Sequence, residues 1–147
     1  MIRLIFGSKF RAKNIVSEFS SEYNIFHIRR ENQIQLQNTI PVTADFRALA
    51  VLIKISSKRL LIDSFSQHTA KGLGLNSVVT WVANKPTQFG YENNINIVAN
   101  PETISPELKG SVFNKYQIDG NLIEFPYNSE SEIFNVEEII DAIREVE

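Results

Sequence analysis

The chain has 147 residues, of which 43% are hydrophobic and 22% charged, as expected for one soluble globular domain with its own core. Its net charge of -2 offers no broad basic surface for nucleic acid, and the lack of cysteine excludes disulfides, thiolate zinc sites and cysteine nucleophiles. With only two histidines, no EF-hand loop and no apolar run near the roughly 18 residues of a membrane span, we expect a cytoplasmic protein without a transmembrane segment, bound metal or cofactor.

The first part of the chain predicts a β-α-β unit. Residues 2–6 form an apolar run that indicates a strand, and Ser8 can cap the helix that follows. That helix has an apolar stripe at helical spacing, made of Ala12, Ile15, Val16, Phe19 and Tyr23. Residues 24–28 are a second β-like run. The polar stretch 29–42 is expected to be a loop that leads into a short strand.

A second helix and a third main strand follow. Thr43 is a plausible N-cap for a helix over residues 45–56. Its expected buried stripe is Phe46, Leu49, Ala50 and Ile53. Residues 60–63 form a short run without alternation, which is typical of a strand buried on both faces of a parallel sheet. The next helix is expected to end near Gly74, a suitable left-handed cap.

The last third of the chain predicts two more strands and a terminal helix. Residues 77–83 and 95–99 read as strands, and the Pro- and Gly-containing region 101–126 holds possible short strands at 111–113 and 122–125. Asn135 can cap the terminal helix, with Glu138 three residues later as in a capping box. Its apolar face is Val136, Ile139, Ile140, Ile143 and Val146. The pattern predicts one α/β domain over residues 1–147, with a mainly parallel sheet and helices on both faces.

The turn between the third main strand and its helix is the strongest candidate for a functional site. Ligands of open α/β sheets bind beyond the carboxyl ends of the strands. A helix start also offers unpaired N–H groups and a partial positive charge, both suited to phosphate. Ser64 could cap the helix and bind phosphate, and His68 could point at the same anion. The alternative is that Asp63 or Ser64 is only a cap and His68 a surface residue.

Two further clusters could contact the nucleoside or sugar of such a ligand. The segment 81–91 begins with Trp81 and continues through Asn84 and Lys85, and it should lie beside the Asp63 turn on the same sheet edge. Glu31 follows the second strand, where a carboxylate could accept the hydroxyls of a ribose. The alternatives are a Pro- and Gly-shaped connection with packed aromatics, and a solvated charge cluster at a loop start.

From Thr43 onward, the ordered motifs resemble the carboxyl-terminal half of a family 9 glycosyltransferase, the group that includes the bacterial lipopolysaccharide heptosyltransferases. The resemblance lies in a helix, a strand that ends in Asp63-Ser64 with His68 beyond it, an Ala-containing helix with a small-residue turn, a strand and a Pro loop. It covers roughly residues 8–99 and is weak after Pro101. Phe65 stands where the family usually has glycine.

The resemblance implies a two-domain GT-B enzyme with Rossmann-like halves, of which this chain would be the half that binds the nucleotide-sugar donor. Asp63, Ser64, the amide of Phe65 and His68 would hold the donor diphosphate, and Glu31 would be the likeliest ribose ligand. The reaction would invert the anomeric carbon without a metal, in lipopolysaccharide or other cell-surface glycan synthesis. Because the chain has about half the family's length, the acceptor-binding half and its catalytic base would be missing, and no catalytic residue is assigned here.

Two other interpretations stay open. The chain could be a free-standing flavodoxin-like binding or regulatory module, although no cluster of aspartates follows its first strand. It could also be a structural domain that pairs through its terminal helix. An exposed apolar stripe at Val136, Ile139 and Ile143 would support that second alternative.

Overall fold

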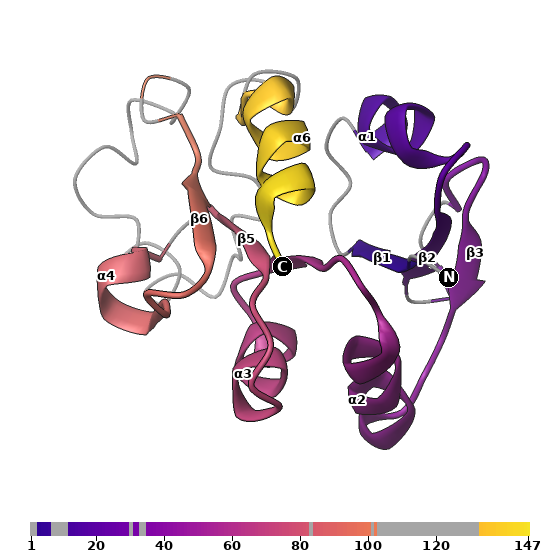
Figure 1. Cartoon of the computed structure of the whole chain (residues 1–147), viewed down its shortest axis with the longest axis horizontal. Helices are drawn as coiled ribbons and strands as arrows, with labels where there is room; N and C mark the ends of the chain where they lie inside the picture. Colours follow the sequence, from indigo (N-terminus) through magenta and orange to yellow (C-terminus); the bar gives the residue numbers. More distant parts are fainter. Residues whose placement is uncertain are drawn as a thin grey trace.

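The computed structural model describes residues 3–6, 12–29, 31–32, 35–82, 84–100, 102 and 133–147. In these residues parallel strands alternate with helices, which confirms the predicted α/β class (Figure 1). The possible strands at 111–113 and 122–125 lie outside the described residues, as does the predicted cap Ser8.

The first sheet has the order β1-β2-β3, with every strand parallel to its neighbour. It consists of β1 (Arg3–Phe6), β2 (Asn24–Ile28) and β3 (Ile40–Val42). The helix α1 (Ala12–Phe19) connects β1 to β2, as predicted, but it ends at Phe19, so Tyr23 of the predicted stripe lies between α1 and β2 and packs edge to face on the Phe19 ring. These three strands and one helix therefore form the expected β-α-β unit, extended by one short edge strand.

The second sheet has the order β4-β5-β6 and is also entirely parallel. Its strands are β4 (Leu60–Ile62), β5 (Val78–Trp81) and β6 (Ile95–Val98). The helix α3 (Phe65–Gly72) joins β4 to β5, and Gly74 follows it at a φ of 73°, as expected for a left-handed position at a helix end. The single turn α4 (Pro86–Phe89) lies between β5 and β6.

The two sheets meet at β1 and β4, which lie side by side. After β3 the chain returns through α2 (Phe46–Ile55) to β4 at the centre, instead of adding another strand at the β3 edge. The six strands therefore follow the spatial order β3, β2, β1, β4, β5, β6. The chain winds outward in one direction from β1 and in the other direction from β4.

Two expectations about α2 were wrong. Asp45, not Thr43, caps the helix, because its Oδ1 accepts a hydrogen bond of 2.8 Å from the N–H of Ala48. Thr43 instead donates its hydroxyl to the carbonyl of Arg29, at 3.4 Å. Phe46 is 73% exposed, because its ring packs against Phe65 at the start of α3 and not into the core, whereas Ile53 of the same predicted stripe is fully buried.

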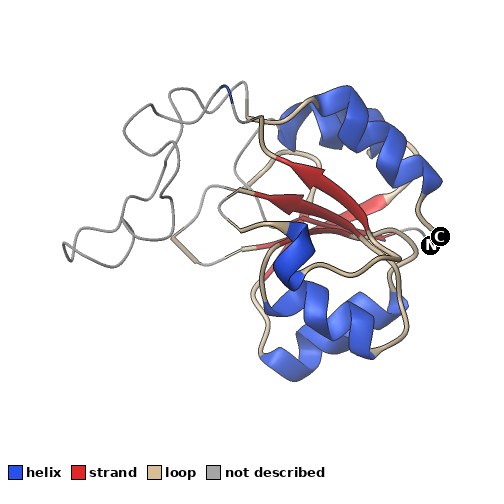
Figure 2. Cartoon of the chain, turned by 90° about the vertical axis from the view of Figure 1, so that its left-hand side faces the viewer, coloured by secondary structure: helices blue, strands red, loops and turns tan. Residues whose placement is uncertain are grey.

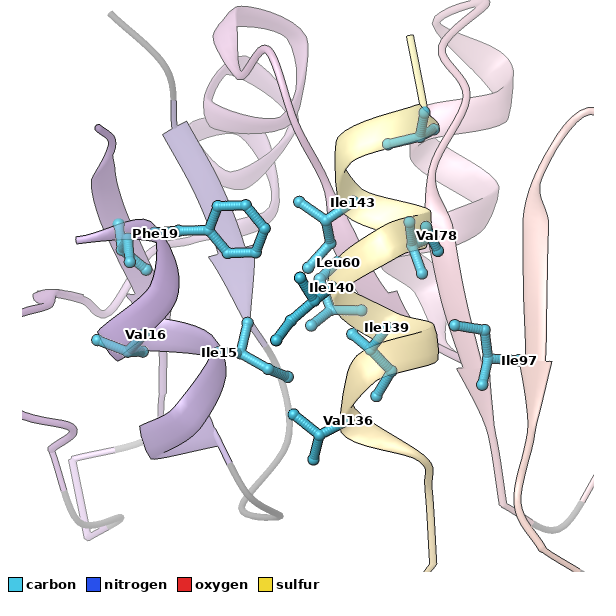
Figure 3. Close-up of a cluster of buried hydrophobic side chains, with 13 residues drawn as sticks. Ile15, Val16, Phe19, Leu60, Val78, Ile97, Val136, Ile139, Ile140 and Ile143 are labelled. Atoms are coloured by element: carbon cyan, nitrogen blue, oxygen red, sulfur yellow. The ribbon is translucent and has the colours of Figure 1, made fainter. Parts of the chain in front are cut away.

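The helices cover both faces of the sheet layer (Figures 1 and 2). On one face, α1 packs against α6 (Val136–Glu145), which Asn135 caps by accepting from the N–H of Glu137 at 3.1 Å. Figure 3 shows their side chains converging with those of the strands on a single apolar cluster. The cluster includes Ile15, Phe19, Leu60, Val78, Ile97, Val136, Ile139, Ile140 and Ile143. The apolar stripe of α6 is thus buried within this chain and not exposed, so it does not favour pairing through the terminal helix.

On the other face, α2 and α3 lie side by side over β4 and β5. Their shared cluster is Ile53, Leu61, Ala70, Val79 and Trp81, with Leu49 and Leu52 packed against it. Neighbouring residues of β4 and β5 point to opposite faces and are buried on both, as the apolar run predicted. This packing fixes the start of α3 relative to the ends of β4 and β5.

Two cations just before β4 hold the end of α6. Lys58 donates to the carbonyls of Arg144, at 3.0 Å, and of Val146. Arg59 is buried and donates to the carbonyls of Asn76 at 2.7 Å and of Ser56, and to that of Glu147, just beyond α6, at 3.3 Å. Burial lowers the pKa of Arg59 from its usual high value. Cations near the last carbonyls of a helix complement its dipole, so this pair ties α6 to the second sheet.

Candidate functional site

The candidate site begins where β4 ends. After Ile62, Asp63 and Ser64 lead directly into α3, and Ser64 takes the extended conformation of an N-cap. Its Oγ accepts from the N–H of Ser66 at 3.3 Å and lies 2.8 Å from the Ser66 hydroxyl. The first turn of α3 carries no acidic side chain. The helix start therefore keeps its partial positive charge and a pair of hydroxyl groups, both of which suit an anion.

The Asp63 carboxylate joins three parts of the site. Its Oδ1 accepts from the Nε2 of Gln67 at 3.0 Å, one helical turn further along α3. Its Oδ2 accepts from the Nδ2 of Asn84, which lies beyond the end of β5. The two loops that the sequence placed on one sheet edge are therefore in direct contact. With each oxygen hydrogen-bonded to an amide, Asp63 holds the turn in place rather than facing an anionic ligand.

The sequence did not identify Gln67, which is fully buried. It lies beside the turn from Asp63 into α3, which we call the corner. A carboxylate can only accept, so the bond to Asp63 fixes the amide nitrogen toward that residue and the oxygen away from it. The Gln67 Oε1 has no hydrogen-bond partner among the described residues. The spacing of Asp63 and Gln67, four residues across a helix start, is the sequence signal that could have revealed this pair.

His68 contacts the second loop of the site. Its Nδ1 lies 2.8 Å from the hydroxyl of Tyr91, and the two rings meet edge to face with centroids 5.7 Å apart. The ammonium of Lys71 lies 5.6 Å from the centre of the same tyrosine ring. His68 as a whole is exposed. Tyr91 belongs to the segment 81–91 that was expected beside this turn, but its pairing with His68, 23 positions away, was not predicted.

Gly90 sets the position of Tyr91. Its N–H donates to the carbonyl of Pro86 at 2.8 Å, which closes the single turn of α4. A β-carbon at Gly90 would lie 2.5 Å from that oxygen and 2.9 Å from the Pro86 Cα. Both are backbone atoms, so they cannot swing aside as a flexible side chain would. Only glycine allows this close approach without displacing the loop.

The remaining predicted residues lie in different surroundings. Trp81 is fully buried, and its indole N–H donates to Asn96 Oδ1 at 2.9 Å, so no face of its ring is open to a ligand. Lys85 is exposed and precedes α4 without a side-chain capping bond. Glu31 is exposed beyond β2, where its carbonyl accepts from Arg29 Nη1 at 3.1 Å. β1 separates the strand that precedes Glu31 from the one that precedes Asp63.

Metal-ligand clusters and membrane-spanning helices are two other features that would indicate a function in the described residues. No three His, Asp or Glu side chains among them gather as metal ligands would. In the same part of the chain, no helix has both the length and the apolar character needed to cross a membrane. Comparison of the chain with known protein families, with curated proteins and with solved structures finds no match. The function is therefore inferred from the geometry of the corner.

Proposed function

We propose that the chain is the nucleotide-sugar-binding domain of an inverting, metal-independent glycosyltransferase of the GT-B type, acting in cell-surface glycan or lipopolysaccharide synthesis. In this proposal the fold is one Rossmann-like half of the enzyme. The donor diphosphate binds at the start of α3, on Ser64, the amide of Phe65 and His68. The acceptor binds to a second, amino-terminal half, which also supplies the base that deprotonates the acceptor hydroxyl.

The observation that carries the proposal is the position of Ser64 in the strand order. β1 and β4 lie side by side, and the chain winds outward from them in opposite directions. Such a reversal of strand order is where open α/β sheets bind their ligands, at the carboxyl ends of the strands. Ser64 follows the carboxyl end of β4, one of the two strands at this point. The start of α3 is therefore the favoured place for a phosphate group.

The same strand order argues against the flavodoxin-like alternative. In that fold β1 lies between β2 and β3, whereas here β1 lies between β2 and β4, with β3 at the outer edge. The order β3, β2, β1, β4, β5, β6 is the one typical of dinucleotide-binding Rossmann folds. It is therefore the nucleotide-binding interpretation that the topology supports.

The corner has the groups that a transfer reaction needs on its leaving-group side. As the acceptor oxygen forms its bond to the anomeric carbon, the bond from that carbon to the diphosphate oxygen breaks, and the electron pair stays on the diphosphate. The acceptor proton goes to the base of the other half. The α3 start and the Ser64 hydroxyl stabilise the negative charge that develops on the diphosphate. Asp63, bound to Gln67 and Asn84, keeps these groups in position.

A titration tests the proposal. ADP, GDP, UDP and CMP are added to the chain in turn, and binding is measured by calorimetry or by NMR shifts of the α3 amides. Since a hydrogen bond to a charged group is worth about 1.5–3 kcal/mol, Ser64→Ala should weaken binding of the preferred nucleotide about tenfold or more. His68→Ala should also weaken it.

Ser17→Ala is the matched control, because Ser17 is an exposed serine of α1, on the opposite face of the sheet from α3. Its affinity should equal that of the unchanged chain. If none of the four nucleotides binds, or if the Ser64→Ala and His68→Ala proteins bind as well as the control, the proposed site is wrong.

A further inference from the structure

Two phenylalanine rings are exposed together next to the proposed phosphate site. Phe46 is the first residue of α2 and is 73% exposed, and Phe65 is the first residue of α3 and is 45% exposed. Their ring centroids lie 4.8 Å apart at an angle of 65°, an edge-to-face contact. Neither residue belongs to a buried apolar cluster of the described chain. The pair therefore presents aromatic surface to solvent.

This pair lies on the ligand-binding edge of the sheet. The helix α2 follows the carboxyl end of β3, and α3 follows the carboxyl end of β4. Because the rings at the starts of both helices touch, the two helix starts meet at one place on this edge. Phe65 directly follows Ser64, and the Cα atoms of neighbouring residues are only about 3.8 Å apart. A phosphate bound at Ser64 would thus have the aromatic pair beside it.

We infer that Phe46 and Phe65 bind the planar base of the nucleotide by stacking. This inference rests on the proposed function, because it needs a nucleotide whose diphosphate is held at Ser64. Every base offers a π-face, so base–aromatic stacking depends little on which base is bound. Phenylalanine has no side-chain donor or acceptor with which to read the edge of a base. The pair should therefore bind purine nucleotides more tightly than pyrimidine nucleotides, because purines have the larger ring system. It should discriminate little between adenine and guanine.

Ring-retaining and ring-removing substitutions separate stacking from general apolar contact. Phe46→Leu and Phe65→Leu keep an apolar side chain but remove the ring, whereas Phe65→Tyr keeps it. Leu73→Ala is the control, since Leu73 is an exposed apolar residue at the opposite end of α3. All three positions are exposed, so these substitutions do not open the core, and thermal unfolding of each variant checks this.

Binding is measured for ADP, GDP, UDP, inorganic pyrophosphate and a hexose 1-phosphate. A stacked base is worth about five- to 150-fold in affinity, and partly exposed rings should give the lower end of that range. We expect each leucine variant to bind ADP and GDP about fivefold more weakly, with pyrophosphate and hexose 1-phosphate binding unchanged. Phe65→Tyr and Leu73→Ala should bind all five ligands like the unchanged chain.

Each other outcome contradicts either the base-binding inference or the proposed function. If the leucine variants bind ADP and GDP normally, or lose pyrophosphate to the same degree, the pair is not a base-binding site, although the phosphate site stands. Loss of hexose 1-phosphate alone would assign the rings to the sugar and overturn the inference. If the unchanged chain binds neither pyrophosphate nor any nucleotide, the proposed function fails, and the base site fails with it.

Discussion

Replacing the Asp63 carboxylate should destabilise the fold measurably, because this side chain joins β4, α3 and the segment after β5. In Asp63→Ala both amide bonds are lost, from Gln67 Nε2 and from Asn84 Nδ2. Asn84 is partly exposed, so water can replace its lost partner. Gln67 is fully buried, so its amide N–H group is left without a partner.

The expected magnitude follows from these two bonds. Leaving one buried donor unsatisfied costs about 1–3 kcal/mol, and the exposed bond adds about 0.5–1 kcal/mol. We therefore expect the free energy of unfolding of Asp63→Ala to fall by about 1.5–4 kcal/mol. This would be a large share of the ~5–15 kcal/mol typical of a domain. Asp63→Asn, which keeps one acceptor oxygen, should lose less.

Urea unfolding followed by circular dichroism measures this loss, and a double-mutant cycle apportions it. Asn84→Ala alone should cost about 0.5–1 kcal/mol, and in the Asp63→Ala background it should cost almost nothing, because the shared bond is already gone. A loss below about 0.5 kcal/mol for Asp63→Ala, or fully additive costs in the cycle, would refute the role of this carboxylate.

Two further perturbations test other parts of the structure. Burial, and secondarily the positive charge of Arg29, lower the pKa of His27, so the folded state binds a proton at this residue less readily than the unfolded chain. The unfolded chain binds a proton below pH ~6.5, so urea midpoints should fall as the pH drops below this value, and less so in His27→Gln. Equal pH dependence in both proteins would contradict this. Gly90→Ala should displace the loop that holds Tyr91, moving the NMR signals of the His68 ring while Gly72→Ala, which has open space around it, leaves them unchanged. Unmoved His68 signals in Gly90→Ala would show that the turn can accept a side chain.

The topology explains why the corner is supported by bonds from several elements. Parallel strands place all their carboxyl ends on one edge, so the segments after β4 and β5 come together there. The contact between Asp63 and Asn84 is the direct result of that arrangement. The contact between His68 and Tyr91 is a second link between the same two segments. A ligand at the start of α3 would thus bind to a turn that two independent bonds hold in place.

The sequence by itself determined those features that depend on neighbouring residues. The β2 run, the stripe of α6 and the Asn135 cap follow from local periodicity and from local hydrogen bonds, and all three are confirmed. The left-handed position of Gly74 and the start of α3 at Ser64 are local in the same sense. Such features depend little on the rest of the fold, because their partners lie within a few residues.

Only the tertiary structure decided which faces of these elements meet solvent. Phe46 belongs to the apolar stripe of α2 yet is exposed, because the start of α2 lies against Phe65 and not against a strand. Trp81 was a candidate for contact with the nucleoside or sugar, yet it ends β5 and is covered on every side. The bonds of Asp63 to Asn84 and of His68 to Tyr91 span 21 and 23 positions. No local pattern encodes such distances, because they are set by which strand lies beside which.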